Sequence, residues 1–104
     1  MKEIYQNTYN KFISTVEVFV NYARENGSKN SKRYYKHFNT LLNEVIDIDV
    51  KCRNILSDLE YVQMIINMTR VTDFLIVLIS VDKPYKEIYK LIKDALLDAK
   101  SNVA

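Results

Sequence analysis

The chain of 104 residues contains one glycine, Gly27, and one proline, Pro84. Average usage gives about 12 of these two residues together in a chain of this length. A sandwich or barrel of short strands needs many glycine-rich turns, so this composition disfavours a β fold. Long helices with few, short connections fit it. We therefore expect an all-α fold, a compact bundle of four or five helices in one domain over residues 1–104.

Apolar side chains between residues 3 and 26 recur at steps of three and four, which predicts a first helix with one buried face. Gly27 follows directly and suits the left-handed residue that ends many helices. A second helix should then begin at Ser28 or Ser31, because either hydroxyl can accept a hydrogen bond from an early backbone N–H. Its expected apolar positions are Tyr34, Tyr35, Phe38, Leu41, Leu42 and Val45.

The segment 50–80 contains neither glycine nor proline. We expect a central buried helix there, with Asp49 able to cap its start. The sequence leaves open whether this segment is one helix or two, with a break near residues 69–72. The part 70–81 is rich in β-branched residues, but a lone strand would leave its backbone groups unpaired. By helical spacing the expected buried stripe is Cys52, Ile55, Leu59, Val62 and Ile66.

A last helix is predicted after "DKP", residues 82–84. Asp82 can cap it, and Pro84 suits its first turn, where the missing N–H has no helical partner. The expected inward positions are Tyr85, Ile88, Tyr89, Ile92, Ala95, Leu96 and Ala99. The outward side carries Lys83, Lys86, Lys90 and Lys93, which we interpret as a solvated face.

The stretch "GSKNSKRYYKH", residues 27–37, is the strongest candidate for a binding surface. Between Glu25 and Glu44 the chain has no acidic residue. The net charge of the whole chain is only +2, so an affinity for nucleic acid can come from local clustering alone. The candidate residues for contact with protein or nucleic acid are Lys29, Asn30, Lys32, Arg33, Tyr34 and Lys36.

Three interpretations of this stretch stay open. Helical spacing arranges its cations in two rows that could contact phosphates, with tyrosines that could stack on bases. The same face could instead bind an acidic protein partner. The third interpretation is an ordinary solvated helix start, because lysines beside a core stripe keep a helix soluble.

No motif for catalysis, metal or cofactor binding is visible in the sequence. Cys52 is the only cysteine and His37 the only histidine. A thiol nucleophile needs a partner base, and a zinc site needs several such ligands. The stretch "DIDVKCRN", residues 47–54, lacks the glycine and the distal glutamate of a calcium loop. We expect no enzyme activity, no cofactor and no metal.

The N-terminus lacks the apolar region of a signal peptide. The longest strongly apolar run, residues 74–79, is shorter than the roughly 20 residues of a membrane span. We expect a cytosolic protein without membrane contact. The chain also has eight tyrosines. They either bridge core and water or are partly covered by a second chain, as in a homodimer.

Two pieces of the sequence are "YARENGSKNSKRYYKHFNTLLNEVI", residues 22–46, and "KPYKEIYKLIKDAL", residues 83–96. They resemble the helical C-terminal region of phage regulatory and antirepressor proteins of the Rha type. The similar elements are a helix that ends in Gly-Ser-Lys-Asn, a basic helix with a Tyr-Tyr pair, and a Tyr-Lys-Glu-Ile-Tyr helix. With a diverged middle, the resemblance extends from about residue 15 to about residue 97.

The resemblance implies a phage or mobile-element protein that acts on regulators or on host machinery. In that family this region accompanies an N-terminal DNA-binding domain, which we do not find in this sequence, so we expect a stand-alone interaction module. Our leading hypothesis is a protein-binding module in the cytoplasm of a bacterial host. It would occupy the surface of a phage or host protein as a regulator or inhibitor. The alternative is a nucleic-acid-binding transcriptional regulator that uses the basic segment 29–37.

Overall fold

The computed structural model describes residues 2–47 and 56–103, and from residue 99 onward the backbone alone. Four α-helices account for most of these residues: α1 (Lys2–Glu25), α2 (Arg33–Ile46), α3 (Asp58–Ser80) and α4 (Tyr85–Val103). The described residues contain no strand. The predicted all-α bundle is therefore confirmed, with four helices. Residues 69–72 lie inside α3, so the break that the sequence left open there does not occur.

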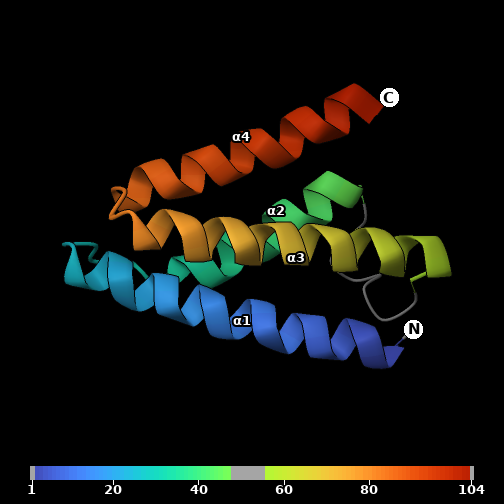
Figure 1. Cartoon of the computed structure of the whole chain (residues 1–104), viewed down its shortest axis with the longest axis horizontal. Coiled ribbons are helices and arrows are strands. Elements are labelled where there is room, and N and C mark those ends of the chain that lie inside the picture. The colour runs from blue at the N-terminus through green and yellow to red at the C-terminus, as the bar shows by residue number, and fades with distance from the viewer. Residues whose placement is uncertain (1, 48–55, 104) are drawn as a thin grey trace.

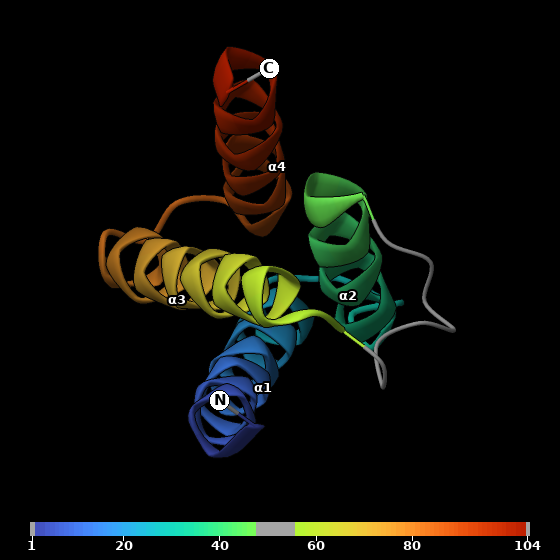
Figure 2. The same ribbon diagram turned by 90° about the vertical axis from the view of Figure 1, so that its right-hand side faces the viewer.

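The four helices surround one core (Figure 1). Helices α1 and α3 run side by side in the same direction and make the most extensive contact between two helices. Helices α2 and α4 run the opposite way. In Figure 2, α3 and α2 lie on opposite sides of the bundle, with α1 below and α4 above. This arrangement brings α2 beside α4, although their first residues, Arg33 and Tyr85, are about 50 positions apart in the sequence.

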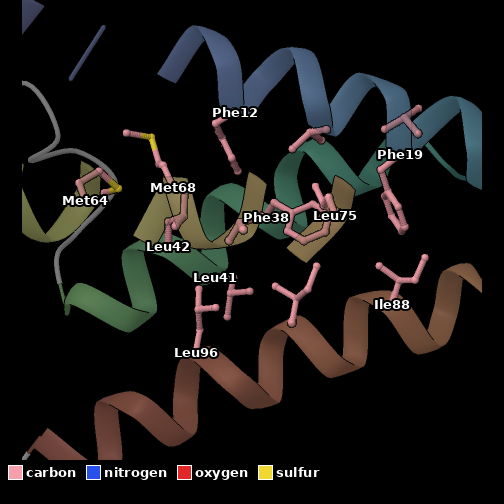
Figure 3. Packing of buried hydrophobic residues seen from close by; sticks show 14 residues of the cluster. Phe12, Phe19, Phe38, Leu41, Leu42, Met64, Met68, Leu75, Ile88 and Leu96 are labelled. Carbon is pink, nitrogen blue, oxygen red and sulfur yellow. The ribbon is translucent and has the colours of Figure 1, made fainter. Parts of the chain in front are cut away.

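Large apolar side chains from every helix meet in the middle of the bundle (Figure 3). Burial of one such side chain stabilises the folded state by about 1.5–3 kcal/mol. The buried side chains are Phe12, Val16, Phe19 and Val20 from α1, Phe38, Leu41 and Leu42 from α2, Met64, Met68, Val71 and Leu75 from α3, and Ile88, Ile92 and Leu96 from α4. The predicted inward faces of the first, second and last helices supply most of this core.

The end of α1 was predicted correctly. Gly27 has a φ of 99°, and its N–H donates to the carbonyl of Arg24. The N–H of Ser28 donates to the carbonyl of Ala23. These two bonds form the Schellman motif, which needs a left-handed residue at the position that glycine occupies here.

The predicted role of Asp82 was wrong. This residue ends α3 and does not cap α4, because it is the left-handed residue (φ 56°) of a second Schellman arrangement. Its N–H donates to the carbonyl of Ile79, and the N–H of Lys83 donates to that of Leu78. Aspartate tolerates this backbone conformation better than most residues other than glycine. Pro84 directly precedes α4, and its carbonyl accepts the first helical bond, from Ile88.

The start of α2 also differs from the prediction. The helix follows Lys32, and no side chain caps it, so the expected serine cap is wrong. The N–H groups of Arg33, Tyr34 and Tyr35 donate to carbonyls three residues earlier, at 3.0 to 3.3 Å. This tight turn satisfies the early donors that a serine hydroxyl would otherwise serve.

Helix α3 begins with a capping box that sequence reasoning missed. The N–H of Glu60 donates to Ser57 Oγ at 3.2 Å, and the N–H of Ser57 donates to Glu60 Oε1 at 2.9 Å. Hydrogen bonds to the Glu60 carboxyl, first from the backbone and then from the side chain of Ser57, lower its pKa. The signal was present as serine followed three residues later by glutamate. The cap expected at Asp49 lies outside the described residues.

The buried face of α3 is not the predicted one. Cys52 and Ile55 lie outside the described residues, and Leu59, Val62 and Ile66 are exposed. The opposite face is buried through Tyr61, Met64, Met68, Val71, Thr72 and Leu75. Both faces are apolar in sequence, but the outer one also carries Arg70 and Asp73, whose charges are costly to remove from water.

Among the described residues, α3 is the one helix that is long and apolar enough to cross a membrane. Its most apolar window has a mean hydropathy of 1.6, and a third of that window is buried inside the bundle. Core helices of soluble proteins meet the same two criteria, so length and composition do not separate the two cases. From the sequence we considered only the apolar run 74–79, which is too short to span a membrane. The whole of α3 is longer than this run.

Candidate anion-binding groove

The six candidate residues of the basic stretch do not share one environment. Five of them are exposed at the turn before α2 or on its first turn: Lys29, Asn30, Lys32, Arg33 and Lys36. The sixth, Tyr34, is half-buried. The structure thus separates an exposed basic surface from a tyrosine that belongs to the packing beneath it.

Tyr34 joins three helices through its ring. Its centroid lies 4.9 Å from that of Phe19 in α1 and 5.5 Å from that of Tyr89 in α4, both edge to face. Phe38 of α2 and Tyr85 of α4 lie at 6.3 and 6.4 Å. Burial, and then the neighbouring Tyr85 hydroxyl, raise the pKa of Tyr34. Edge-to-face pairs of this kind add about 0.5–1.5 kcal/mol beyond the area they bury, so Tyr34 holds the bundle together.

The side chain of Tyr35 has different neighbours from that of Tyr34. It is also half-buried, and burial together with the Glu17 carboxylate of α1 raises its pKa. The Tyr-Tyr pair is therefore divided, with Tyr34 among the rings near α4 and Tyr35 influenced by α1. Neither tyrosine lies free on the basic surface.

Two lysines from α4 line the same surface as the basic stretch. An open groove of about 620 Å³ is lined from α2 by Arg33, Lys36, His37, Thr40, Leu41 and Glu44, and from α4 by Tyr89 and Lys93. A second hollow of about 400 Å³ is lined by Gly27, Ser28, Lys29, Asn30, Arg33, Tyr34, His37, Tyr85 and Lys86. Because Arg33 and His37 line both hollows, we treat them as one surface and call it the α2–α4 groove.

The α2–α4 groove concentrates positive charge. Its lining includes five cationic side chains, and Glu44 is its one carboxylate. The five are Lys29, Arg33, Lys36, Lys86 and Lys93. Lys32 is exposed but lines neither hollow. The lysines of α4, interpreted from sequence as a solvated face only, thus include two that add to the basic stretch. A cleft lined by one sign of charge raises the local concentration of ions of the opposite sign.

The lining of the groove also includes aromatic side chains, Tyr89 in the first hollow and Tyr34 and Tyr85 in the second. The ring of Tyr89 lies 5.1 Å from Phe38 and 5.8 Å from His37, measured between centroids. Burial raises the pKa of the Tyr89 hydroxyl, and the charge of Glu44 and the hydroxyl of Tyr34 raise it further. The cations therefore stand around a surface that also offers apolar ring area to a bound molecule.

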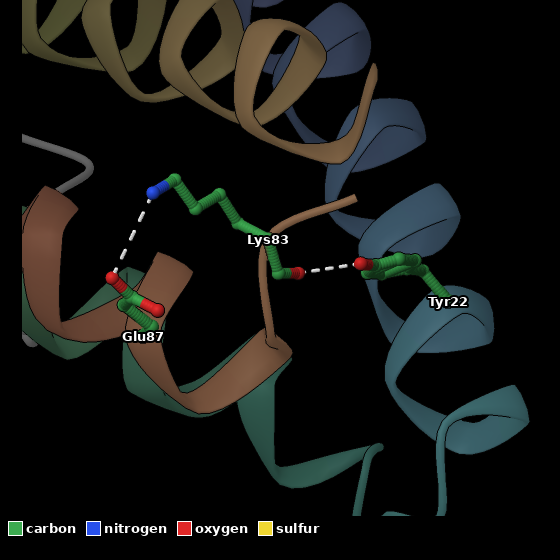
Figure 4. A network of polar contacts seen from close by, with 3 residues as sticks. All are labelled: Tyr22, Lys83 and Glu87. Atoms are coloured by element: carbon green, nitrogen blue, oxygen red, sulfur yellow. Dashed lines mark hydrogen bonds and ion pairs between the residues drawn. The ribbon is translucent and has the colours of Figure 1, made fainter. Parts of the chain in front are cut away.

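Two polar contacts hold the turn that places α4 beside α2 (Figure 4). The Tyr22 hydroxyl of α1 donates to the carbonyl of Lys83. The Lys83 ammonium lies 3.9 Å from a Glu87 carboxylate oxygen, one helical turn later. Because Lys86 lies between Lys83 and Glu87 in the sequence, these contacts help to set its position beside the turn before α2. The exposed ion pair itself contributes little to stability.

The chemistry of this lining suits anion binding. Ammonium, guanidinium and phenol groups donate hydrogen bonds, and the cations attract carboxylates or phosphates. Among the described residues, no group of three or more His, Cys, Asp or Glu is placed to hold a metal ion. The ring of His37 lies edge to face with Tyr34 and is tilted against Tyr89, and the residue is exposed.

Comparison of the chain with protein-family models, with curated proteins and with solved structures found no match. The resemblance to phage regulatory proteins stays a prediction. The two pieces that carry it, residues 22–46 and 83–96, hold α2 and the first two-thirds of α4. They are thus the two walls of the groove.

Proposed function

We propose that the chain is a binding module whose α2–α4 groove takes an acidic segment of a partner protein. The observation that carries this proposal is the meeting of two separate basic helices around one open groove. Five cations there face one carboxylate, Glu44, in a chain whose net charge is only +2. The excess of positive charge at this surface is therefore larger than that of the whole chain.

The mixture of groups in the groove favours a protein segment over a nucleic-acid backbone. A phosphate backbone is charged at every step, so it brings no apolar group to the aromatic rings of the lining. An acidic peptide carries its charges at intervals, with apolar side chains between them. Such a peptide can place carboxylates on Arg33, Lys36 and Lys93 and lay an apolar side chain on Tyr89. Arg33 can also bind a carboxylate through two parallel hydrogen bonds.

The biological setting that we propose follows from the sequence resemblance. A phage or mobile-element protein of this kind works in the cytoplasm of a bacterial host and occupies a regulator or an enzyme by covering its surface. The resemblance supports the proposal because it covers both walls of the groove. The partner, in this account, presents an acidic segment and loses its own contacts when the module is bound.

A second candidate function is the binding of nucleic acid. It is favoured by the hollow near Gly27, whose lining includes Lys29, Arg33 and Lys86 but no carboxylate. Phosphates bound there would displace counterions, so affinity would fall steeply with salt. The expected slope of the logarithmic plot is about −0.9 per phosphate contacted on duplex DNA.

A binding titration with two probes separates the two functions. The probes are a fluorescent peptide of alternating glutamate and leucine, and a random-sequence DNA duplex. Our proposal predicts tighter binding of the peptide than of the duplex in the same buffer. Tighter binding of the duplex, with a steep salt slope, would support the second candidate instead.

Two double variants with equal changes of charge locate the binding surface. Arg33→Glu with Lys93→Glu reverses one cation on each wall of the groove. Lys32→Glu with Lys90→Glu reverses two exposed cations that line neither hollow. Lys32 directly precedes α2, and Lys90 lies on α4. We expect the first variant to lose peptide binding by about tenfold or more and the second to keep most of it. Equal losses in the two variants would show that net charge, and not the groove, binds the peptide.

A further inference from the structure

The outer face of α3 carries an uncovered apolar stripe. Leu59 is 67% exposed, Ile66 53% and Val77 58%, and Val62 and Ile76 lie exposed on the same side. Elsewhere in the described helices the large exposed apolar side chains are isolated: Ile4 and Val18 on α1 and Leu91 on α4. A contiguous apolar stripe on a soluble surface indicates an interaction site.

The spacing along this face is that of a helix–helix seam. Leu59, Val62, Ile66, Thr69, Asp73, Ile76 and Ser80 follow one another at steps of three and four. This is the repeat with which one helix packs lengthwise against another. With 23 residues, α3 offers a seam about 35 Å long. The occupant that fits such a seam is a second helix.

Two opposite charges interrupt the seam near the middle of α3. Arg70 lies over the ring of Phe74, with 5.9 Å between the guanidinium carbon and the ring centroid, and Asp73 is exposed. Neither residue forms an ion pair with any residue that the structure describes. Apolar positions flank the two charges on both sides, with Val62 and Ile66 before them and Ile76 and Val77 after them.

This pattern is complementary to itself when the partner helix runs the opposite way. A two-fold axis at the level of residues 71 and 72, near the middle of α3, places Arg70 of one copy beside Asp73 of the other, and the same contact forms twice. Ile66 of each copy then faces Ile76 and Val77 of its partner. A parallel pairing would place Arg70 against Arg70 and Asp73 against Asp73, which is repulsive.

We propose that the protein forms a homodimer through antiparallel packing of two α3 helices, with reciprocal Arg70–Asp73 ion pairs at the centre of the interface. A bilayer is a poorer occupant, because it would surround both charges with hydrocarbon. The interface lies on the side of the bundle opposite α2 (Figure 2), so it leaves the α2–α4 groove open. The dimer therefore does not depend on what the groove binds.

Sedimentation equilibrium on the full chain tests this proposal by measuring mass over a wide range of concentration. The chain has a mass of 12.3 kDa, and we expect twice that mass at the upper end of the range. Arg70→Asp and Asp73→Arg should each weaken association by about tenfold or more, since each creates like-charge contacts. The double variant Arg70→Asp with Asp73→Arg should restore it. Lys90→Asp, an equal charge reversal on α4, should have no effect.

Circular dichroism melting shows whether each variant is folded. If Arg70→Asp unfolds because it loses its contact with Phe74, then Asp73→Arg and Ile66→Glu, both at exposed positions, carry the test. A wild type that stays monomeric at every concentration overturns the proposal. A dimer whose affinity is unchanged by the charge reversals would also overturn the proposal. Binding of a monomeric wild type to phosphatidylcholine and phosphatidylglycerol vesicles would also overturn it, by assigning the face to a membrane.

Discussion

The α2–α4 groove and the outer face of α3 are built in opposite ways. In the groove, charged side chains surround aromatic rings that belong to the packing of the bundle. On α3, apolar side chains surround two charges, and the packing lies on the other face of the helix. In the groove, the rings that line the surface therefore also take part in the packing of the bundle. On α3, the exposed residues and the packed residues are different ones. Substitutions at Tyr34 or Tyr89 should change both stability and binding, whereas those on the outer face of α3 should change association alone.

The largest expected effect separates the two faces of α3. Leu75→Ala empties a fully buried position and should lower the free energy of unfolding by about 2–5 kcal/mol. Val77→Ala, two residues later on the exposed face, should change it by less than about 0.5 kcal/mol. Urea denaturation at low protein concentration, where the proposed dimer is dissociated, measures both values. Similar losses at the two positions would show that α3 is buried all round.

The next effect tests the coupling inside the groove. Tyr34→Ala removes the ring contacts to Phe19 and Tyr89 and should lower the free energy of unfolding by about 1–3 kcal/mol. Lys36→Ala, at the exposed wall of the groove, should leave stability within about 0.5 kcal/mol of wild type and weaken peptide binding. Thermal and urea unfolding, combined with peptide titration, measure both properties. A Tyr34→Ala protein of unchanged stability would contradict the structural role given to this ring.

The smallest effect is a dependence on alkaline pH. Burial raises the pKa of Tyr34 and Tyr89 above the ordinary value of 10.0. The unfolded chain therefore releases these protons first as the pH rises, and stability that is complete below pH 10 is lost as the pH passes through the raised values. Tyr89→Phe should reduce this loss of stability at alkaline pH, whereas Asn10→Phe, at an exposed position, should not. Unfolding curves on both sides of pH 10 measure it, and an equal loss in both variants would contradict the assignment.

Some of this architecture could be read from the sequence because its signals are local. The scarcity of glycine and proline predicted long helices, and Gly27 marked the end of α1 correctly. The apolar spacing of Ile88, Ile92 and Leu96 predicted the buried face of α4. In each case one stripe or one residue type decides the outcome, and no distant contact is needed.

The errors have physical causes that can be named. Helix α3 has apolar residues on two faces, so periodicity alone could not choose between the stripe with Ile66 and the stripe with Met68. The position of Arg70 and Asp73 was the available signal, because charged residues seldom lie inside a core. Asp82 could either start or end a helix, and only the backbone bonds around it decide which.

The candidate groove was predicted in part. Its cations on α2 are next to one another in the sequence and were singled out together. Lys86 and Lys93 lie 50 or more residues away in the sequence and become part of the same surface only when α4 packs beside α2. Tyr34, which stood among the candidate contact residues, turned out to pack against α1 and α4. Local sequence patterns do not predict which distant residues are brought together when helices pack.

A residue-by-residue map of peptide binding by nuclear magnetic resonance tests the proposed role of the α2–α4 groove most directly. The labelled chain would be titrated with the alternating glutamate–leucine peptide while its backbone amide signals are followed. We expect saturable shifts that cluster on both walls of the groove, at Arg33, Lys36 and His37 in α2 and at Lys86, Tyr89 and Lys93 in α4. Shifts that instead cluster on the outer face of α3, around Ile66 and Val77, would contradict this role and assign the binding function to the other side of the bundle.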